Sequence, residues 1–310
     1  MLALSLSVLL FFLPLTDQQN QPGKKEQILQ LSKKYFPENY KVLEAYDEKS
    51  INSMADGQTV KEYVYSISTV VHEGFHTYQN TFTSYYDTLI RYRINDTLWY
   101  GARNFKTFPS KEINKIVPLG TRKKIFRYDT YVNSKEKIHV TQQYGALGLL
   151  EEMVAYYHSF ATELALFNYF RDQYGWSDAE PWIKYLGAIG GFRYSLIEFE
   201  LFISWYLQVA QSDHPAIYKS IVADPWFKAT FRFLHNANIR FTTQYDINRK
   251  IILEKLGDKV MIMSDAIIPT AALKPGYSGY SGAGLFDTDL KTMQDMLQQP
   301  EHKILDQLLK

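Results

Sequence analysis

Two histidines four residues apart in a strongly helical stretch constrain this 310-residue chain most. Across residues 59–83, apolar side chains recur every three or four positions, which is typical of a helix with one buried face. His72 and His76 lie in this stretch, and residues four apart on a helix point in nearly the same direction. Glu73 lies about 100° around the helix from His72. The sequence therefore predicts a buried helix whose two imidazoles can share one metal ion.

The residues around these histidines favour the same interpretation. Residues 69–71 and 77–78 are uncharged, and uncharged surroundings keep the field of a bound ion strong. Gly74 lies inside the predicted helix, where glycine costs about 1 kcal/mol relative to alanine. We therefore expect another element to approach closely at this position. A helix with two surface histidines is the alternative.

Composition excludes several classes of protein. The formal net charge is +1, and the short basic run at 122–124 is expected to be solvated, so nucleic-acid binding is not predicted. The chain contains no cysteine. This excludes a disulfide scaffold, a zinc ribbon, a thiol nucleophile and a lipid anchor on cysteine. Any metal site must therefore use histidine and carboxylate ligands.

The N-terminus predicts export. Residues 2–15 are almost wholly apolar and are followed by a polar stretch at 17–21. Such a run is short for a membrane span but suits the apolar region of a secretory signal. We predict that residues 1–16 are a signal peptide, that the mature chain begins near residues 16–21, and that the protein is secreted or periplasmic without a stable membrane span. The run lacks a preceding basic residue and an Ala-x-Ala site, so a misassigned start codon or a buried first helix is the alternative.

Apolar periodicity predicts an α+β fold that is predominantly helical. Helical spacing is found at 24–35, 147–170, 182–211 (with a possible break at 190–191), 225–235, 242–256 and from Asp287 onward. Residues 39–46 are predicted as a strand and 123–142 as a β-hairpin, whereas 95–122 are predicted to be irregular. We expect a small N-terminal lobe with a few strands (17–142) and a helical C-terminal lobe (143–310).

Two segments resemble the zincin metallopeptidases. The first is residues 69–78, which contain His72-Glu73-Gly74-Phe75-His76; the second is residues 149–157, with Glu152 followed three positions later by Ala155. Both are similar to the gluzincin type, whose third zinc ligand is a glutamate on a later helix. The resemblance covers only these segments. It implies a zincin-like fold and one Zn²⁺ per chain, with His72, His76 and Glu152 as ligands and Glu73 as general base.

The remaining site residues are less strongly specified. Glu151 competes with Glu152, and the three-residue spacing to Ala155 favours Glu152. Tyr156 stands where gluzincins often place a carboxylate that holds the first histidine's free N–H, and its hydroxyl could substitute. Candidate donors to a transition-state oxyanion are His235, Tyr277 and Tyr280, although an ordinary core or loop role is favoured for each of them. No ligand spacing is found at His139, His158, His214 and His302, which are expected to be structural.

These features predict a zinc-dependent peptidase whose partner is a peptide or protein substrate. Glu73 would accept a proton from the attacking water. An exposed strand at 39–46 or in the hairpin at 123–142 would pair with the substrate backbone. The alternatives are a non-catalytic, zincin-derived protein that binds a peptide or glycan, and a metal-dependent hydrolase of a non-peptide bond. The intact Glu73 argues against the non-catalytic alternative.

Overall fold

The computed structural model describes residues 22–310. The predicted signal peptide and the predicted start of the mature chain lie outside the described residues. Within residues 22–310, no helix combines the length and apolar character needed to cross a membrane.

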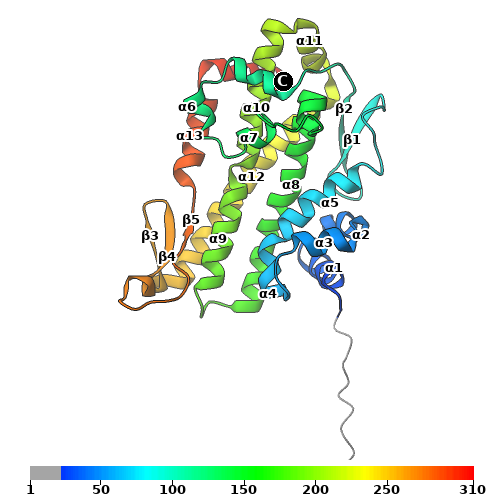
Figure 1. Cartoon of the computed structure of the whole chain (residues 1–310). Coiled ribbons are helices and arrows are strands. Elements are labelled where there is room, and N and C mark those ends of the chain that lie inside the picture. Colours follow the sequence, from blue (N-terminus) through cyan, green and yellow to red (C-terminus); the bar gives the residue numbers. More distant parts are fainter. Residues whose placement is uncertain (1–21) are drawn as a thin grey trace, which may run out of the picture.

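The described part of the chain is mostly helical, as predicted (Figure 1). Its helices are α1 (Lys24–Tyr35), α2 (Tyr40–Ala45), α3 (Glu48–Met54), α4 (Val60–Tyr63), α5 (Ile67–Gln79), α6 (Leu119–Arg122), α7 (Tyr128–Tyr131), α8 (Val140–Tyr174), α9 (Glu180–Arg193), α10 (Ser195–Asp213), α11 (Pro215–Ala223), α12 (Pro225–Leu256), α13 (Asp287–Leu297) and α14 (Asp306–Leu309). Two small antiparallel sheets accompany them, which agrees with the α+β class. One pairs β1 (Leu89–Arg93) with β2 (Trp99–Arg103), and the other has the order β3 (Val260–Met263), β4 (Ala266–Pro269), β5 (Ala283–Gly284).

The longer helices match the apolar periodicity closely. The predicted helix at 24–35 is α1, and the terminal helix begins at Asp287 as expected. Residues 182–211 do form two helices, α9 and α10, but the break lies at Tyr194 rather than at the two glycines. The two helices predicted at 225–235 and 242–256 are one continuous helix, α12, which ends before Gly257.

Both strand predictions were wrong. Residues 39–46 contain α2, and Val42, Leu43 and Tyr46 are buried there. The first two are adjacent and the third follows three positions later, which is the spacing of one helix face and not of a strand. Within 123–142 the structure has α7 and the start of α8 instead of a hairpin. Tyr128 and Tyr131 are buried three residues apart, so the buried face repeats with a helical period and not with the period of two read from the sequence. The nearest hairpin is β1–β2, and β2 lies in the region predicted to be irregular.

Helix α8 is the central element of the fold. In Figure 1 it runs through the middle of the molecule, and it packs against α5, α9, α10 and α12. Leu149, Met153, Phe160 and Leu166 are fully buried along it. Burial on several sides explains why apolar side chains are found all around α8, because a helix packed between other helices has no single solvent-facing side over most of its length. The expected lobe boundary at residue 142 lies within α8.

Gly145 kinks α8 near its beginning. Its φ of 51° lies in the left-handed region, where residues with a Cβ are strained. A Cβ here would also collide with the Phe108 carbonyl oxygen and the Tyr206 hydroxyl. That hydroxyl accepts from the Phe108 N–H at 2.8 Å and lies 2.9 Å from the Phe108 oxygen, so the contact is fixed from both sides. Residues 140–144 therefore run in a different direction from the rest of α8.

A buried acid lies in the interface between α5 and α8. Glu163 is 1% exposed, and its Oε1 accepts a hydrogen bond from Ser68 Oγ at 2.6 Å. Burial raises the pKa of this carboxyl from 4.5 to about 8, and the Ser68 hydrogen bond opposes that rise only in part. Between these two pH values the folded protein keeps the proton while the unfolded chain releases it. Glu163 therefore lowers the free energy of unfolding progressively as the pH rises from about 4.5 to about 8.

Glu163→Gln should remove this pH dependence. Glutamine keeps an oxygen for Ser68 but cannot ionise, so the stability of the variant relative to the wild type should increase from pH 5 to pH 9. Because one pKa unit corresponds to about 1.4 kcal/mol, the increase has an upper bound of about 5 kcal/mol. Urea unfolding at pH 5, 7 and 9 measures it, with the exposed Glu254→Gln as control. A difference that stays constant with pH would contradict this assignment.

Candidate metal centre

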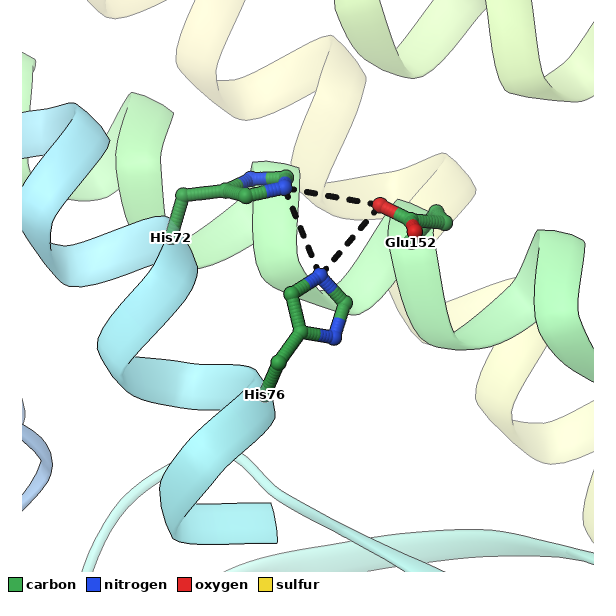
Figure 2. Close-up of side chains that lie close together, drawn as sticks. All are labelled: His72, His76 and Glu152. Carbon is green, nitrogen blue, oxygen red and sulfur yellow. Dashed lines mark hydrogen bonds and ion pairs between the residues drawn. The ribbon is translucent and has the colours of Figure 1, made fainter. Parts of the chain in front are cut away.

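Three side chains from two helices bring their ligand atoms together (Figure 2). His72 and His76 project from α5, and Glu152 projects from α8. Glu152 Oε2 lies 3.4 Å from His72 Nε2 and 3.3 Å from His76 Nε2, and the two Nε2 atoms are 3.4 Å apart. The four-residue spacing on α5 therefore does place both imidazoles on one side, facing α8.

The packing of α5 explains the glycine inside the motif. A Cβ on Gly74 would lie 3.3 Å from both Tyr46 and Val42, which is tighter than ordinary van der Waals contact. Helix α2 thus approaches α5 closely on the face away from Glu152, as the mid-helix glycine predicted. This contact fixes the position of α5 and of the histidines it carries.

The triangle of ligand atoms has the size that a metal ion requires. Neighbouring corners of a regular tetrahedron lie roughly 1.6 bond lengths apart, so bonds of about 2.0–2.1 Å place zinc ligands roughly 3.3–3.4 Å from one another. The three observed separations fall in this range. Glu152 Oε2 is also buried without a hydrogen-bond partner among residues 22–310, a costly arrangement that a bound cation would relieve. The residues present therefore fit a metal ion.

The electrostatics favour an ionised Glu152. Burial alone would raise the pKa of its carboxyl, but the facing imidazoles of His76 and His72 outweigh burial and hold the pKa well below its usual range. Conversely, Glu152 and Glu151 raise the pKa of the His76 imidazole despite its burial. The carboxylate is thus in its ligand form at neutral pH, and cation binding at His76 would compete with a proton.

The two adjacent glutamates have different roles. Glu151 Oε1 accepts a hydrogen bond from His76 Nδ1 at 2.9 Å, and the other ring nitrogen of His76, Nε2, faces Glu152. Glu151 Oε2 accepts from the Tyr85 hydroxyl at 2.5 Å. Glu152, not Glu151, therefore lies in the ligand triangle, and Glu151 holds a ligand from behind.

Tyr156 does not take the role expected from the resemblance. Its hydroxyl pairs with the Tyr131 hydroxyl at 3.0 Å, while its ring packs edge-on against the His72 imidazole at 4.5 Å between centroids. His72 Nδ1 is buried and has no hydrogen-bond partner among the described residues. The aromatic ring, rather than a hydrogen bond, thus restrains the orientation of His72.

A surface cavity of ≈ 380 Å³ opens beside the ligand triangle. Glu73 is half-buried and lines this cavity together with His76 and Glu152. The opposite wall consists of residues from the start of α8 and the loop after α5: Ile138, His139, Val140, Gln143, Tyr144 and Tyr85. A larger cavity of ≈ 600 Å³ lies between α1, α4 and the far end of α8, but no histidine or carboxylate lines it. The chemistry therefore belongs to the smaller cavity.

His139 is a cavity residue that the sequence did not single out. It caps the N-terminus of α8, with Nδ1 3.3 Å from the Thr141 backbone N, and its Nε2 lies 4.0 Å from Glu152 Oε1. His139 shows no ligand spacing in the sequence, because the tertiary fold, and not a local helix turn, brings it next to Glu152. Its one available signal was its place immediately before the helix that carries Glu152.

The three predicted oxyanion donors do not line the cavity. His235 lies on α12 and pairs with Glu200 Oε2 of α10 at 3.2 Å. Tyr277 and Tyr280 lie in the loop before β5, where the Tyr277 hydroxyl donates to the Tyr280 carbonyl oxygen. The other histidines have side-chain partners away from the cavity, each distant in the sequence: His158 with Asn39, His214 with Glu112, and His302 with Ser204. The polar side chains that do line the cavity beside Glu151 and Glu152 include His139 and Tyr85.

Comparison with protein-family models, curated proteins and solved structures gives no match to this chain.

Proposed function

We propose that this protein is a zinc-dependent peptidase with a zincin-like site of the gluzincin type. The observation that carries the proposal is the ligand triangle of His72, His76 and Glu152 beside a cavity that Glu73 also lines. Two histidines and one glutamate are a donor set of catalytic zinc sites, which leave a fourth position open for water or substrate. A purely structural zinc site would use four protein ligands.

In this proposal the residues that hold the metal ion and the residue that transfers the proton are different. When bound, zinc supplies Lewis-acid chemistry, lowering the pKa of water and polarising a carbonyl. Glu73 follows His72 directly on α5 and faces the cavity, so it is placed to accept a proton there and return it to the leaving amine. His72, His76 and Glu152 only hold the ion. Glu73 is thus the general base, and its carboxylate is free of the ligand triangle.

The cavity suits a segment of peptide chain. It is open to solvent on one side, and its outer wall combines the apolar Ile138 with the stacked rings of Tyr85 and Tyr144, 3.5 Å apart at their centroids. Most of the other side chains that line the cavity are polar, and aromatic surfaces combined with placed polar groups are found in ligand sites. With neither predicted edge strand present, side-chain contacts in this cavity take the place of strand pairing in the proposal. The apolar N-terminal segment adds the expectation that the enzyme acts outside the cytoplasm.

A peptide library with and without chelator tests this function. We expect the purified protein to generate new N-termini, detected by mass spectrometry, and to lose at least about 10²-fold of this activity after treatment with 1,10-phenanthroline. Zinc added in slight excess of the chelator should restore cleavage. Cleavage that resists chelation would contradict a metal-dependent mechanism. Stoichiometric zinc without cleavage of any library peptide would favour the binding-protein or non-peptide hydrolase alternative.

A further inference from the structure

The loop between α5 and β1 sends one side chain toward the metal centre. Tyr85 is half-buried against the cavity, whereas its neighbour Tyr86 is 94% exposed. Three contacts hold Tyr85: its ring stacks on Tyr144 with an interplanar angle of 3°, its hydroxyl bonds Glu151, and its backbone oxygen accepts from the Asn104 side-chain amide. A loop residue held at its ring, its hydroxyl and its backbone has a fixed position.

Tyr85, Glu151 and His76 form a continuous hydrogen-bonded relay. The phenol donates to Glu151 Oε2 at 2.5 Å, and Glu151 Oε1 accepts from His76 Nδ1 at 2.9 Å. Burial and the adjacent Glu151 carboxylate raise the pKa of the Tyr85 phenol well above 10, so this group keeps its proton and donates. Both oxygens of Glu151 are thereby bonded, and the carboxylate plane cannot rotate without losing a hydrogen bond.

His76 depends on this relay more than His72 does. The side chain of His76 is 21% exposed, compared with 8% for His72, because His76 faces the cavity. His72 is restrained by the ring of Tyr156, as described above. Packing therefore fixes the first imidazole, while hydrogen bonding must fix the orientation and the tautomer of the second.

We propose that Tyr85 is a positioning residue of the metal centre, which acts through Glu151 to hold His76 with its Nε2 lone pair toward the ion. This inference rests on the metal centre of the proposed function but not on the reaction it performs. Loss of the hydroxyl would leave Glu151 Oε2, on a residue that is 4% exposed, without its donor. The carboxylate would then turn toward another partner, and His76 would lose its orientation.

Tyr85→Phe tests the proposal, with Tyr86→Phe as the matched control. Phenylalanine keeps the stack on Tyr144 and removes only the hydroxyl. We expect Tyr85→Phe to weaken zinc binding about tenfold, at the lower end of the 10–100-fold typical for partners of metal ligands, and Tyr86→Phe to leave it unchanged. Competition with a chromophoric chelator measures both affinities. The visible absorption bands of the Co²⁺-loaded protein should shift in Tyr85→Phe alone, and thermal unfolding reports whether each variant is folded.

A double-mutant cycle with Glu151→Gln separates the relay from a general structural effect. If Tyr85 acts through Glu151, the double variant should bind zinc no more weakly than Glu151→Gln alone. Additive losses would overturn the relay, and so would wild-type affinity in Tyr85→Phe. If the zinc affinities of the variants change as expected but the wild-type protein cleaves no peptide, the positioning role of Tyr85 is supported and the proposed function is contradicted. A wild-type chain that binds no zinc would overturn both.

Discussion

Glu73→Gln is expected to abolish most hydrolysis while zinc stays bound. Glutamine has nearly the same shape as glutamate but cannot accept the proton of the attacking water. A positioned general base contributes about 10²–10⁴-fold, so the turnover rate should fall by at least this factor. Because Glu73 is not part of the ligand triangle, metal analysis should still find about one zinc per chain.

The matched control is Glu48→Gln, an exposed glutamate on α3 that does not line the cavity. Its rate should equal that of the wild type under the same conditions. A Glu73→Gln enzyme that keeps full activity would show that another group carries the proton. A loss of zinc in this variant would instead place Glu73 among the ligands.

Glu152→Gln is expected to weaken zinc binding by more than about 10²-fold, beyond the 10–100-fold typical for residues that only support a ligand. The amide oxygen is neutral, whereas the carboxylate is held ionised by two facing imidazoles. The variant would therefore remove a charged ligand from a buried site and not just a hydrogen bond. Zinc affinity measured by chelator competition, for this variant and for Glu151→Gln, gives the comparison.

The adjacent glutamate makes this test stringent. Glu151 and Glu152 share the helix, the burial and the chemistry, and they differ in which partner each carboxylate meets. Glu151→Gln should lose affinity only through the orientation of His76. Equal losses of zinc affinity in the two variants would contradict the assignment of Glu152 as ligand and Glu151 as supporting residue. Tight zinc binding by Glu152→Gln would show that Glu152 is not a ligand.

Sequence periodicity predicted the helices better than the strands for a physical reason. A long helix repeats its buried face many times, so α1 and most of α8 could be read from apolar spacing alone. Short elements repeat it once or twice. Around α7, Tyr128 and Tyr131 are buried by contacts with α10 and α8 rather than by a local pattern, and Arg127 pairs with Glu198 at 2.7 Å across the interior. Such tertiary partners are not visible in the local sequence.

The same distinction separates the predicted from the unpredicted site residues. His72 and His76 are related by helix geometry, and Glu152 was chosen by a resemblance, so all three could be named in advance. Tyr85 lies in a loop and His139 caps a helix, and the positions of both segments depend on the whole fold. The oxyanion candidates, which do not line this cavity, were chosen by residue type, and residue type alone does not say which cavity a side chain will reach.

The kink at Gly145 divides the part of the candidate site that belongs to α8 and its cap into two segments that run in different directions. Ile138, His139 and Tyr144 lie before the kink and form the wall of the cavity, whereas Glu151 and Glu152 lie after it and face α5. Tyr144 connects the two parts, because its ring stacks on Tyr85, whose hydroxyl donates to Glu151. In the proposed enzyme, a substitution of Tyr144 would therefore affect both the cavity wall and the carboxylate that holds His76.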